Sequence, residues 1–417
     1  MGICCCAGDV TRRGSCPYHA RTMSTTLFAS PFTPRAAYAL RAFFALLGVV
    51  SGTWMALIPG FRLQWGLGLE ALGWVLLSIG VGSVSAYPLA HWGLPRFGSA
   101  RMCAFSATGL AGAVVLVAMA PSLTVAVLGL FAFGLSAGLM DSAINTQAVT
   151  QEAASGRALM AGMHGFYSLG NLIAGAWVSL TVAWGWHLPQ VLGGVGAAGL
   201  ALPWVLQMGL LREAKGEPVG AAAEAAVGGA RAVPWSRALL LLGALIVAAY
   251  LVEGASLDWG GVYLRQHAGA SLAQAPWAFT AFSATMVVGR FLGDRVIQAW
   301  GAHVTLQRGG LLAMAGLSLA LLWPRLEVVV VAFAVLGLGL SVVVPVLFSL
   351  AGRLNPGDGG RTVALVAMMG YAGVLSGPAV IGWIAERAGL PSALALLVLL
   401  AALIWRQGPR AGRKSAG

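Results

Sequence analysis

Twelve apolar stretches of helical length run along the chain between Tyr38 and Trp405, with short polar connections between them. A helix needs about 20 mostly apolar residues to cross a bilayer, because lipid offers the backbone no hydrogen-bond partners. The pattern therefore predicts an all-α membrane protein with twelve transmembrane helices. The expected helices span residues 37–60, 71–91, 102–120, 123–149, 160–183, 189–211, 238–262, 273–297, 308–323, 326–350, 361–385 and 389–406.

The composition fits a chain that lies mostly in lipid. Of its 417 residues, 59% are hydrophobic and 9% are charged, and the mean hydropathy is +0.83. The chain has 23 arginines and two lysines, a bias that suggests a GC-rich bacterial genome. No phosphate-binding loop, nucleophile motif or Cys/His metal spacing occurs in the sequence, so we expect no ATP hydrolysis, no catalytic residues, no metal and no cofactor.

The basic residues indicate how the helices are oriented. A net charge of +12 would suggest a nucleic-acid partner in a soluble protein, but here the charges cluster on one side of the expected membrane. With a cytoplasmic N-terminus, all but four of the 25 Lys and Arg residues fall on the cytoplasmic side. The exceptions are Arg62, Arg265, Arg325 and Arg387. The positive-inside rule predicts both termini in the cytoplasm of a bacterial inner membrane, with the lipid bilayer and no nucleic acid as partner.

Five segments are expected along the chain. They are a cytoplasmic tail (1–35), an N-terminal six-helix bundle (36–211), a cytoplasmic linker (212–236), a C-terminal six-helix bundle (237–406) and a second tail (407–417). Residues 1–22 carry four of the five cysteines and lack a helical or strand pattern. Two interpretations stay open: these residues form a tail, or they are an upstream extension and the true start is Met23.

The two bundles share an internal repeat of 203 to 205 residues. Gly98 aligns with Gly301 at an offset of 203, and Gly134-Leu-Ser aligns with Gly339-Leu-Ser at an offset of 205. Six helices in each half give both halves the same orientation. We therefore expect a pseudo-two-fold axis along the membrane normal, as in transporters that rock two bundles around a central site.

Four segments resemble a known family. They are Gly134–Asn145 (GLSAGLMDSAIN), His164–Gly170 (HGFYSLG), Glu253–Trp259 (EGASLDW) and Gly289–Arg295 (GRFLGDR). Over about residues 36–406 the chain resembles the major facilitator superfamily, and locally the bacterial subgroup of fucose-permease-like sugar:proton symporters. The resemblance implies two six-helix bundles that move a small solute by alternating access.

The loop after the second helix departs from the superfamily pattern. That loop normally contains Asp-Arg-x-Gly, but the two halves here read Pro95-Arg96-Phe97-Gly98 and Gln298-Ala299-Trp300-Gly301. The usual N-half charge is missing, and Asp294 is expected to do equivalent work in the C-half. The predicted cytoplasmic gate consists of Arg96, Arg290, Asp294 and Arg295.

Asp141 lies well inside the expected fourth helix, where an unpaired carboxylate costs about 2.5–3.5 kcal/mol. Asn145 follows four residues later and shares its helical face, so we expect this face to point into the bundle. The two side chains then line a substrate or proton pathway, or else they only hold helices together by hydrogen bonding.

In the fifth helix, His164, Ser168 and Asn171 follow at spacings of four and three, which aligns them on one stripe. The residues at the repeat positions of Asp141 and His164 are apolar, so the fold does not itself require polar groups there. We assign the stripe to the same pathway. A structural role for His164 as a hydrogen-bond partner remains the alternative.

The seventh helix contains Glu253 and Asp258. A step of five residues rotates by about 140°, so an unbroken helix cannot direct both acids into one cavity. A break near Gly254 would allow it, whereas the alternative leaves Asp258 solvated at the outer interface beside Trp259. Both acids are assigned to the pathway, together with Trp54, whose flat ring could meet a substrate.

These features predict a secondary active transporter that moves a small polar, sugar-like solute together with protons, and that is a monomer. Carboxylates in a low-dielectric cavity favour the neutral form, so they can alternate between proton-loaded and proton-free states. Two alternatives stay open: a proton-driven exporter of drugs or metabolites on the same fold, and a non-transporting receptor or scaffold.

Overall fold

The computed structural model describes residues 33–156, 159–212, 235–354 and 359–414, and these residues are helical apart from short connections. The N-half contains α1 (Pro34–Gln64), α2 (Leu69–Phe97), α3 (Ser99–Ala118), α4 (Leu123–Ser155), α5 (Met160–Ala183), α6 (Leu188–Leu206) and the short η1 (Gln207–Gly209). The C-half contains α8 (Arg237–His267), α9 (Trp277–Leu322), α10 (Leu326–Leu340), α11 (Val343–Leu354), α12 (Gly359–Ala388) and α13 (Leu390–Lys414).

Eleven helical segments of the described chain are long and apolar enough to cross a membrane. One of them, α9, has 46 residues, which corresponds to a length of about 69 Å, more than twice the thickness of a hydrocarbon core. It is interrupted at Gly301, whose φ of 73° and ψ of 162° are not helical. The two arms of α9 are therefore separate crossings. The total of twelve crossings confirms the predicted fold class.

Most helix boundaries differ from the predicted ones by one to eight residues, and one predicted helix is divided. The expected helix 326–350 is divided at Ser341–Val342, because Pro345 has no N–H for the carbonyl of Ser341 and its ring would collide with that carbonyl in a continuous helix. The second arm of α9 begins directly after Gly301 rather than at residue 308. The last helix continues to Lys414, so most of the predicted tail 407–417 is helical. The predicted tail up to residue 32 and linker residues 213–234 lie outside the described residues.

The internal repeat is visible in the backbone. Gly66 (φ 58°), Gly98 (φ 77°) and Gly185 (φ 85°) of the N-half correspond to Gly269 (φ 70°), Gly301 (φ 73°) and Gly389 (φ 83°) of the C-half, at offsets of 203, 203 and 204 residues. A positive φ is a conformation that side chains with a Cβ rarely adopt. Both halves therefore turn between equivalent helices with the same backbone geometry.

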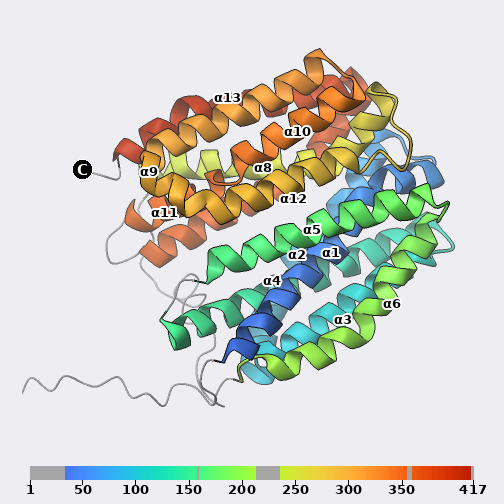
Figure 1. The fold of residues 1–417 in the computed structure, drawn as a ribbon, viewed down its shortest axis with the longest axis horizontal. Coiled ribbons are helices and arrows are strands. Elements are labelled where there is room, and N and C mark those ends of the chain that lie inside the picture. Colours follow the sequence, from blue (N-terminus) through green and yellow to red (C-terminus); the bar gives the residue numbers. More distant parts are fainter. Residues whose placement is uncertain (1–32, 157–158, 213–234, 355–358, 415–417) are drawn as a thin grey trace, which may run out of the picture.

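The helices pack in the same way in both halves. In the N-half, α1 contacts α5, α2 contacts α4, and α3 contacts α6; in the C-half, α8 contacts α12 while α9 contacts α10 and α13. The halves meet through α2 with α12 and α5 with α9 (Figure 1). We call the end of the molecule that holds the start of α1 and the end of α13 the tail end, and the opposite end, with the α1–α2 and α8–α9 turns, the distal end (Figure 1).

Glycines allow the closest helix approaches. A Cβ on Gly134 of α4 would collide with the backbone carbonyl of Ile79 in α2, and one on Gly337 of α10 would collide with that of Phe282 in α9. Small residues at such contacts let helix backbones pack tightly, which is how helices associate where lipid gives no hydrophobic drive.

Replacing Gly134 with Ala should destabilise the protein by about 1–3 kcal/mol, because the added methyl group forces α4 away from α2. Gly112 of α3 is the matched control, since a Cβ there meets nothing within 4 Å. Thermal unfolding of the purified variants in detergent checks this, and equal melting temperatures for the two variants would contradict the packing argument.

Candidate functional site

An ion pair inside the bundle joins two helices of the C-half. An oxygen of Glu253 in α8 lies 3.4 Å from Nη2 of Arg290 in α9, and the two side chains are only 19% and 16% exposed. The same guanidinium reaches across to α5 of the N-half, where its Nη1 donates to the Ser168 hydroxyl at 2.8 Å and to the His164 carbonyl oxygen at 3.4 Å. Arg290 is thus a polar link between the halves at a buried position.

Asp141 and Asn145 form a second polar group, which lies on α4. Asn145 donates its side-chain amide to Oδ1 of Asp141 at 3.0 Å and to the Asp141 backbone carbonyl at 2.9 Å, as expected for residues on one helical face. The Asp141 carboxylate acts electrostatically on several tyrosine hydroxyls, among them those of Tyr87, Tyr250 and Tyr371. These rings form a chain, with centroids 5.6 Å apart for Tyr87 and Tyr371 and 6.2 Å apart for Tyr250 and Tyr371.

The tyrosine chain connects the two acids across the halves. Tyr87 comes from α2 of the N-half, whereas Tyr250 and Tyr371 come from α8 and α12 of the C-half. Tyr250 also lies within the electrostatic reach of both Glu253 and Arg290. The acids of α4 and α8 therefore border one polar region between the halves, and phenol hydroxyls can act there as both donors and acceptors.

The three residues of the predicted stripe on α5 have different surroundings. His164 gives its backbone carbonyl to Arg290, while its imidazole packs edge-on against Phe44 at 5.4 Å between ring centroids. Ser168 is buried and bonded to Arg290. Asn171 is also buried, and its Oδ1 accepts no hydrogen bond from the described residues. Only Ser168 uses its side chain in the ion-pair cluster.

The break that would direct both acids into one cavity is absent, because α8 is continuous from Arg237 to His267. Asp258 lies among buried residues of α8. Its neighbour Trp259 is fully buried, as is Tyr263, whose hydroxyl donates to the Ala320 carbonyl at 2.9 Å. Asp258 itself is partly buried and has no hydrogen bond or ion pair with the described residues. The unbroken helix turns it away from Glu253, as a step of five residues requires.

Trp54 does not border this region. Its indole is 3% exposed and packs against Phe61 and Phe133, with centroid distances of 5.0 and 6.5 Å. The expectation that its ring meets a substrate is corrected to a place in the N-half core, where an aromatic side chain buries a large apolar area.

The predicted cytoplasmic gate is not assembled in this structure. Arg96 donates to the Trp92 carbonyl of its own helix at 2.8 Å and stacks on the Trp92 ring at 4.7 Å. Asp294 and Arg295 are exposed and have no ion-pair partner among the described residues. Arg290 is paired with Glu253 rather than with Asp294; both side chains of the pair are partly buried, whereas Asp294 is exposed.

Further polar contacts between the halves occur at the distal end. One carboxylate oxygen of Glu386, near the end of α12, accepts from the backbone N–H of Leu69 at 2.6 Å and of Glu70 at 3.2 Å. The next residue, Arg387, donates to the Glu70 side chain at 2.9 Å. Since Leu69 and Glu70 begin α2, these bonds tie the C-half to the N-half.

One of these residues, Tyr250, is recognisable from the sequence as a member of the site. Tyr250 precedes Glu253 by three residues and so shares its helical face, which made it a recognisable member of the site. Glu70 and Glu386 are acids in short loops on the expected outer side, and nothing local distinguishes them from solvated charges.

Comparisons with known proteins agree with the fold. The family model described as Major Facilitator Superfamily matches residues 259–416. An uncharacterized MFS-type transporter of Yersinia pestis is 33% identical over 366 residues, which cover 86% of this chain and 91% of the relative. The chain belongs to the major facilitator superfamily. Membrane protein MosC of Rhizobium meliloti is 29% identical to this chain, and the alignment covers 87% of this chain and 86% of MosC.

Solved structures of superfamily transporters share the fold. The crystal structure of the nucleoside transporter NupG superposes with a TM-score of 0.70 at 14% identity, covering 90% of this chain and 98% of NupG. A bacterial homolog of the human lysosomal transporter Spinster, in its inward-facing and occupied conformation, gives a TM-score of 0.68 at 13% identity, covering 91% and 96% of the two chains.

Replacing Arg290 with Gln should lower stability by about 2–4 kcal/mol, because it leaves the Glu253 carboxylate buried without its cation. The double replacement Arg290→Gln with Glu253→Gln should recover much of this loss. Thermal unfolding of the single and double variants measures the coupling. Arg96→Gln serves as the control, since Arg96 contacts only its own helix, and an additive double variant would show that the pair does not interact.

Proposed function

We propose that this superfamily transporter couples the movement of a small polar, sugar-like solute to protons across a bacterial inner membrane, in a symport cycle of alternating access. The observation that supports this most directly is the Arg290 side chain, which binds Glu253 in one half and Ser168 in the other within a membrane-spanning bundle. A single protonation can therefore change a contact between the halves.

Glu253 acts as the switch in this proposal. A carboxylate holds the Arg290 guanidinium by charge, whereas a protonated Glu253 does not, so its protonation frees Arg290 to bind the solute or the N-half. Solute hydroxyls can then replace the bonds to Ser168. Asp141, bonded to Asn145 and within electrostatic reach of tyrosine hydroxyls, is the second proton carrier and a solute ligand.

The orientation follows the placement of positive charges. We assign the tail end to the cytoplasm, because the arginines of the sequence concentrate there, and the distal end to the outside. With Glu386 and Arg387 bonded to α2 at the distal end, the described conformation is closed to the outside. The halves would separate at these contacts to admit a solute from outside.

Replacing Asp141 with Asn should abolish pH-driven accumulation in proteoliposomes while leaving solute exchange, because an amide binds a solute but carries no titratable proton. The solute is chosen by thermal shift from a panel of sugars, sugar acids, polyols and nucleosides, since a bound ligand raises apparent stability. Glu327→Gln, which changes an exposed acid at the start of α10, is the matched control.

A pH-sensitive dye inside the vesicles completes the experiment. Solute added outside should acidify the interior if protons enter with it; alkalinisation would instead indicate exchange for protons, as in an exporter. Full pH-driven accumulation by the Asp141→Asn variant would remove this residue from the coupling role, and no response to any solute by the wild type would contradict the proposed solute class.

Replacing Glu386 with Ala should open the distal end, because it removes both bonds to the start of α2. Spin labels at two exposed distal positions, Gln64 and Leu322, should then show a longer mean distance by pulsed electron resonance than in the unsubstituted protein. Glu327→Ala is the control. An unchanged distance distribution would show that Glu386 does not hold the halves together.

A further inference from the structure

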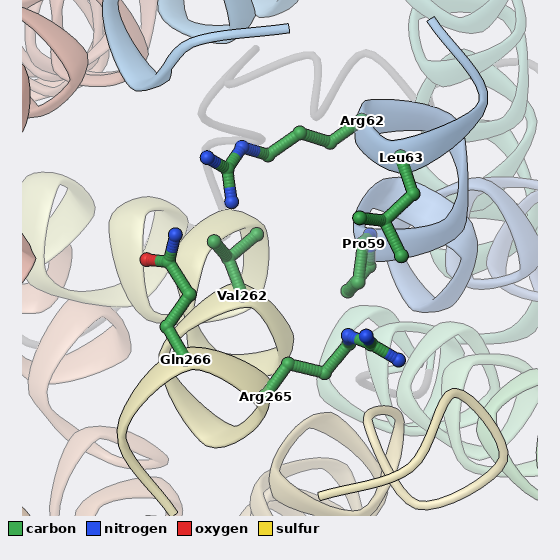
Figure 2. Close-up of a pocket in the computed structure, with 6 residues that line it drawn as sticks. All are labelled: Pro59, Arg62, Leu63, Val262, Arg265 and Gln266. Carbon is green, nitrogen blue, oxygen red and sulfur yellow. The ribbon is translucent and has the colours of Figure 1, made fainter. Parts of the chain in front are cut away.

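A cavity at the distal end lies between α1 and α8, apart from the buried cluster around Arg290. It has a volume of about 200 Å³ and is lined by Pro59, Arg62, Leu63, Val262, Arg265 and Gln266. Figure 2 shows the first three residues on one side and the last three on the other, with the guanidinium groups of both arginines extending into the space between the helices. The N-half and the C-half each contribute one cation.

The two arginines differ in their hydrogen bonding. Arg62 has partners: its Nε donates to the Leu67 carbonyl at 3.0 Å, and its Nη1 and Nη2 lie 2.6 and 3.2 Å from the side-chain oxygen of Gln266 when that amide is oriented to accept. Arg265 is partly buried and has no hydrogen bond or ion pair with any described residue. Its five N–H donors are therefore available to a ligand.

The two positive charges at the cavity are balanced only in part by the protein. Arg62 and Arg265 lie within electrostatic reach of one another. The acid that acts on Arg62 is Glu386, but its carboxylate oxygen already accepts two backbone N–H groups at the start of α2. Two like charges facing one partly buried space repel each other, and a small anion between them would reverse the sign of that interaction.

We propose that this cavity binds an oxyanion group, a carboxylate or a phosphate, between Arg62 and Arg265. The planar guanidinium fork matches the two oxygens of such groups, and bidentate pairs of this kind are among the stronger hydrogen bonds in proteins. The anion comes either from a soluble compound or from the headgroup of an anionic lipid, since the cavity opens at the membrane surface end of both helices.

The site connects the two halves. Arg62 already bridges from α1 to Gln266 on α8, and an anion held by both arginines adds a second bridge at the same place. Binding therefore stabilises the conformation that is closed at the distal end. Asp258 lies seven residues before Arg265 on the same face of α8, about 10 Å along the helix axis. This proposal goes beyond the proposed function and does not depend on the direction of transport.

The test uses the full chain purified in a neutral detergent, with inorganic phosphate titrated against chloride at matched ionic strength. Phosphate should raise the melting temperature of the wild type, and Arg265→Gln should weaken the apparent affinity about tenfold or more, because it removes a charge-assisted contact. Arg325→Gln, which changes an exposed arginine at the same end but outside the cavity, should keep the wild-type response. Arg265→Lys, which keeps the charge without the fork, should lie between them.

A second experiment, in lipid nanodiscs, distinguishes a soluble anion from a lipid headgroup. The melting temperature is measured in nanodiscs of phosphatidylcholine alone and of phosphatidylcholine with phosphatidylglycerol. A rise that requires both phosphatidylglycerol and Arg265, in a protein that does not respond to inorganic phosphate, assigns the site to lipid headgroups and supports the proposal. An equal response of the wild type and the Arg265→Gln variant to each probe, or no response of the wild type to either, would overturn it.

Discussion

A polar group inside a bilayer has to find its partner within the protein, because hydrocarbon offers none. This constraint explains why the described chain is helical, since helices satisfy their own backbone groups. It also explains the Arg290 cluster, in which one guanidinium takes a carboxylate of its own half and a hydroxyl and carbonyl of the other. In the proposed cycle, the pairing that makes the charge tolerable is also the pairing through which a proton influences the contact between the halves.

The two halves pack their helices in the same way but carry different polar residues. Both use positive-φ glycines at equivalent turns and equivalent helix contacts. The acid of the fourth N-half helix, Asp141, has the buried Val346 as its counterpart at the 205-residue offset. A symmetric scaffold thus holds an asymmetric site, which allows the two halves to move alike while only one side of the interface carries each charge.

Much of the fold could be predicted because it depends on local sequence: hydrophobic length places the crossings, and glycine places the turns. The contacts of the site could not, because they join residues far apart in the chain. Arg290 and Ser168 are separated by 122 residues, and the choice of Glu253 over the nearby Asp294 depends on which carboxylate is buried. Trp54 was misplaced for a related reason, since a tryptophan beside a core and one beside a cavity look alike in sequence.

The first turn of α2 depends on the opposite half of the molecule for its hydrogen bonds. Its N-cap residue, Gly68, supplies no side-chain acceptor, and the N–H groups of Leu69 and Glu70 are bonded by Glu386 of the opposite half. By contrast, α5 is capped from within its own half, by Glu152. Any rocking that parts the halves at this end leaves those α2 donors orphaned until water reaches them. Separation of the halves at this end therefore requires hydration of a helix terminus, and solvents that compete poorly for amide protons should slow that separation.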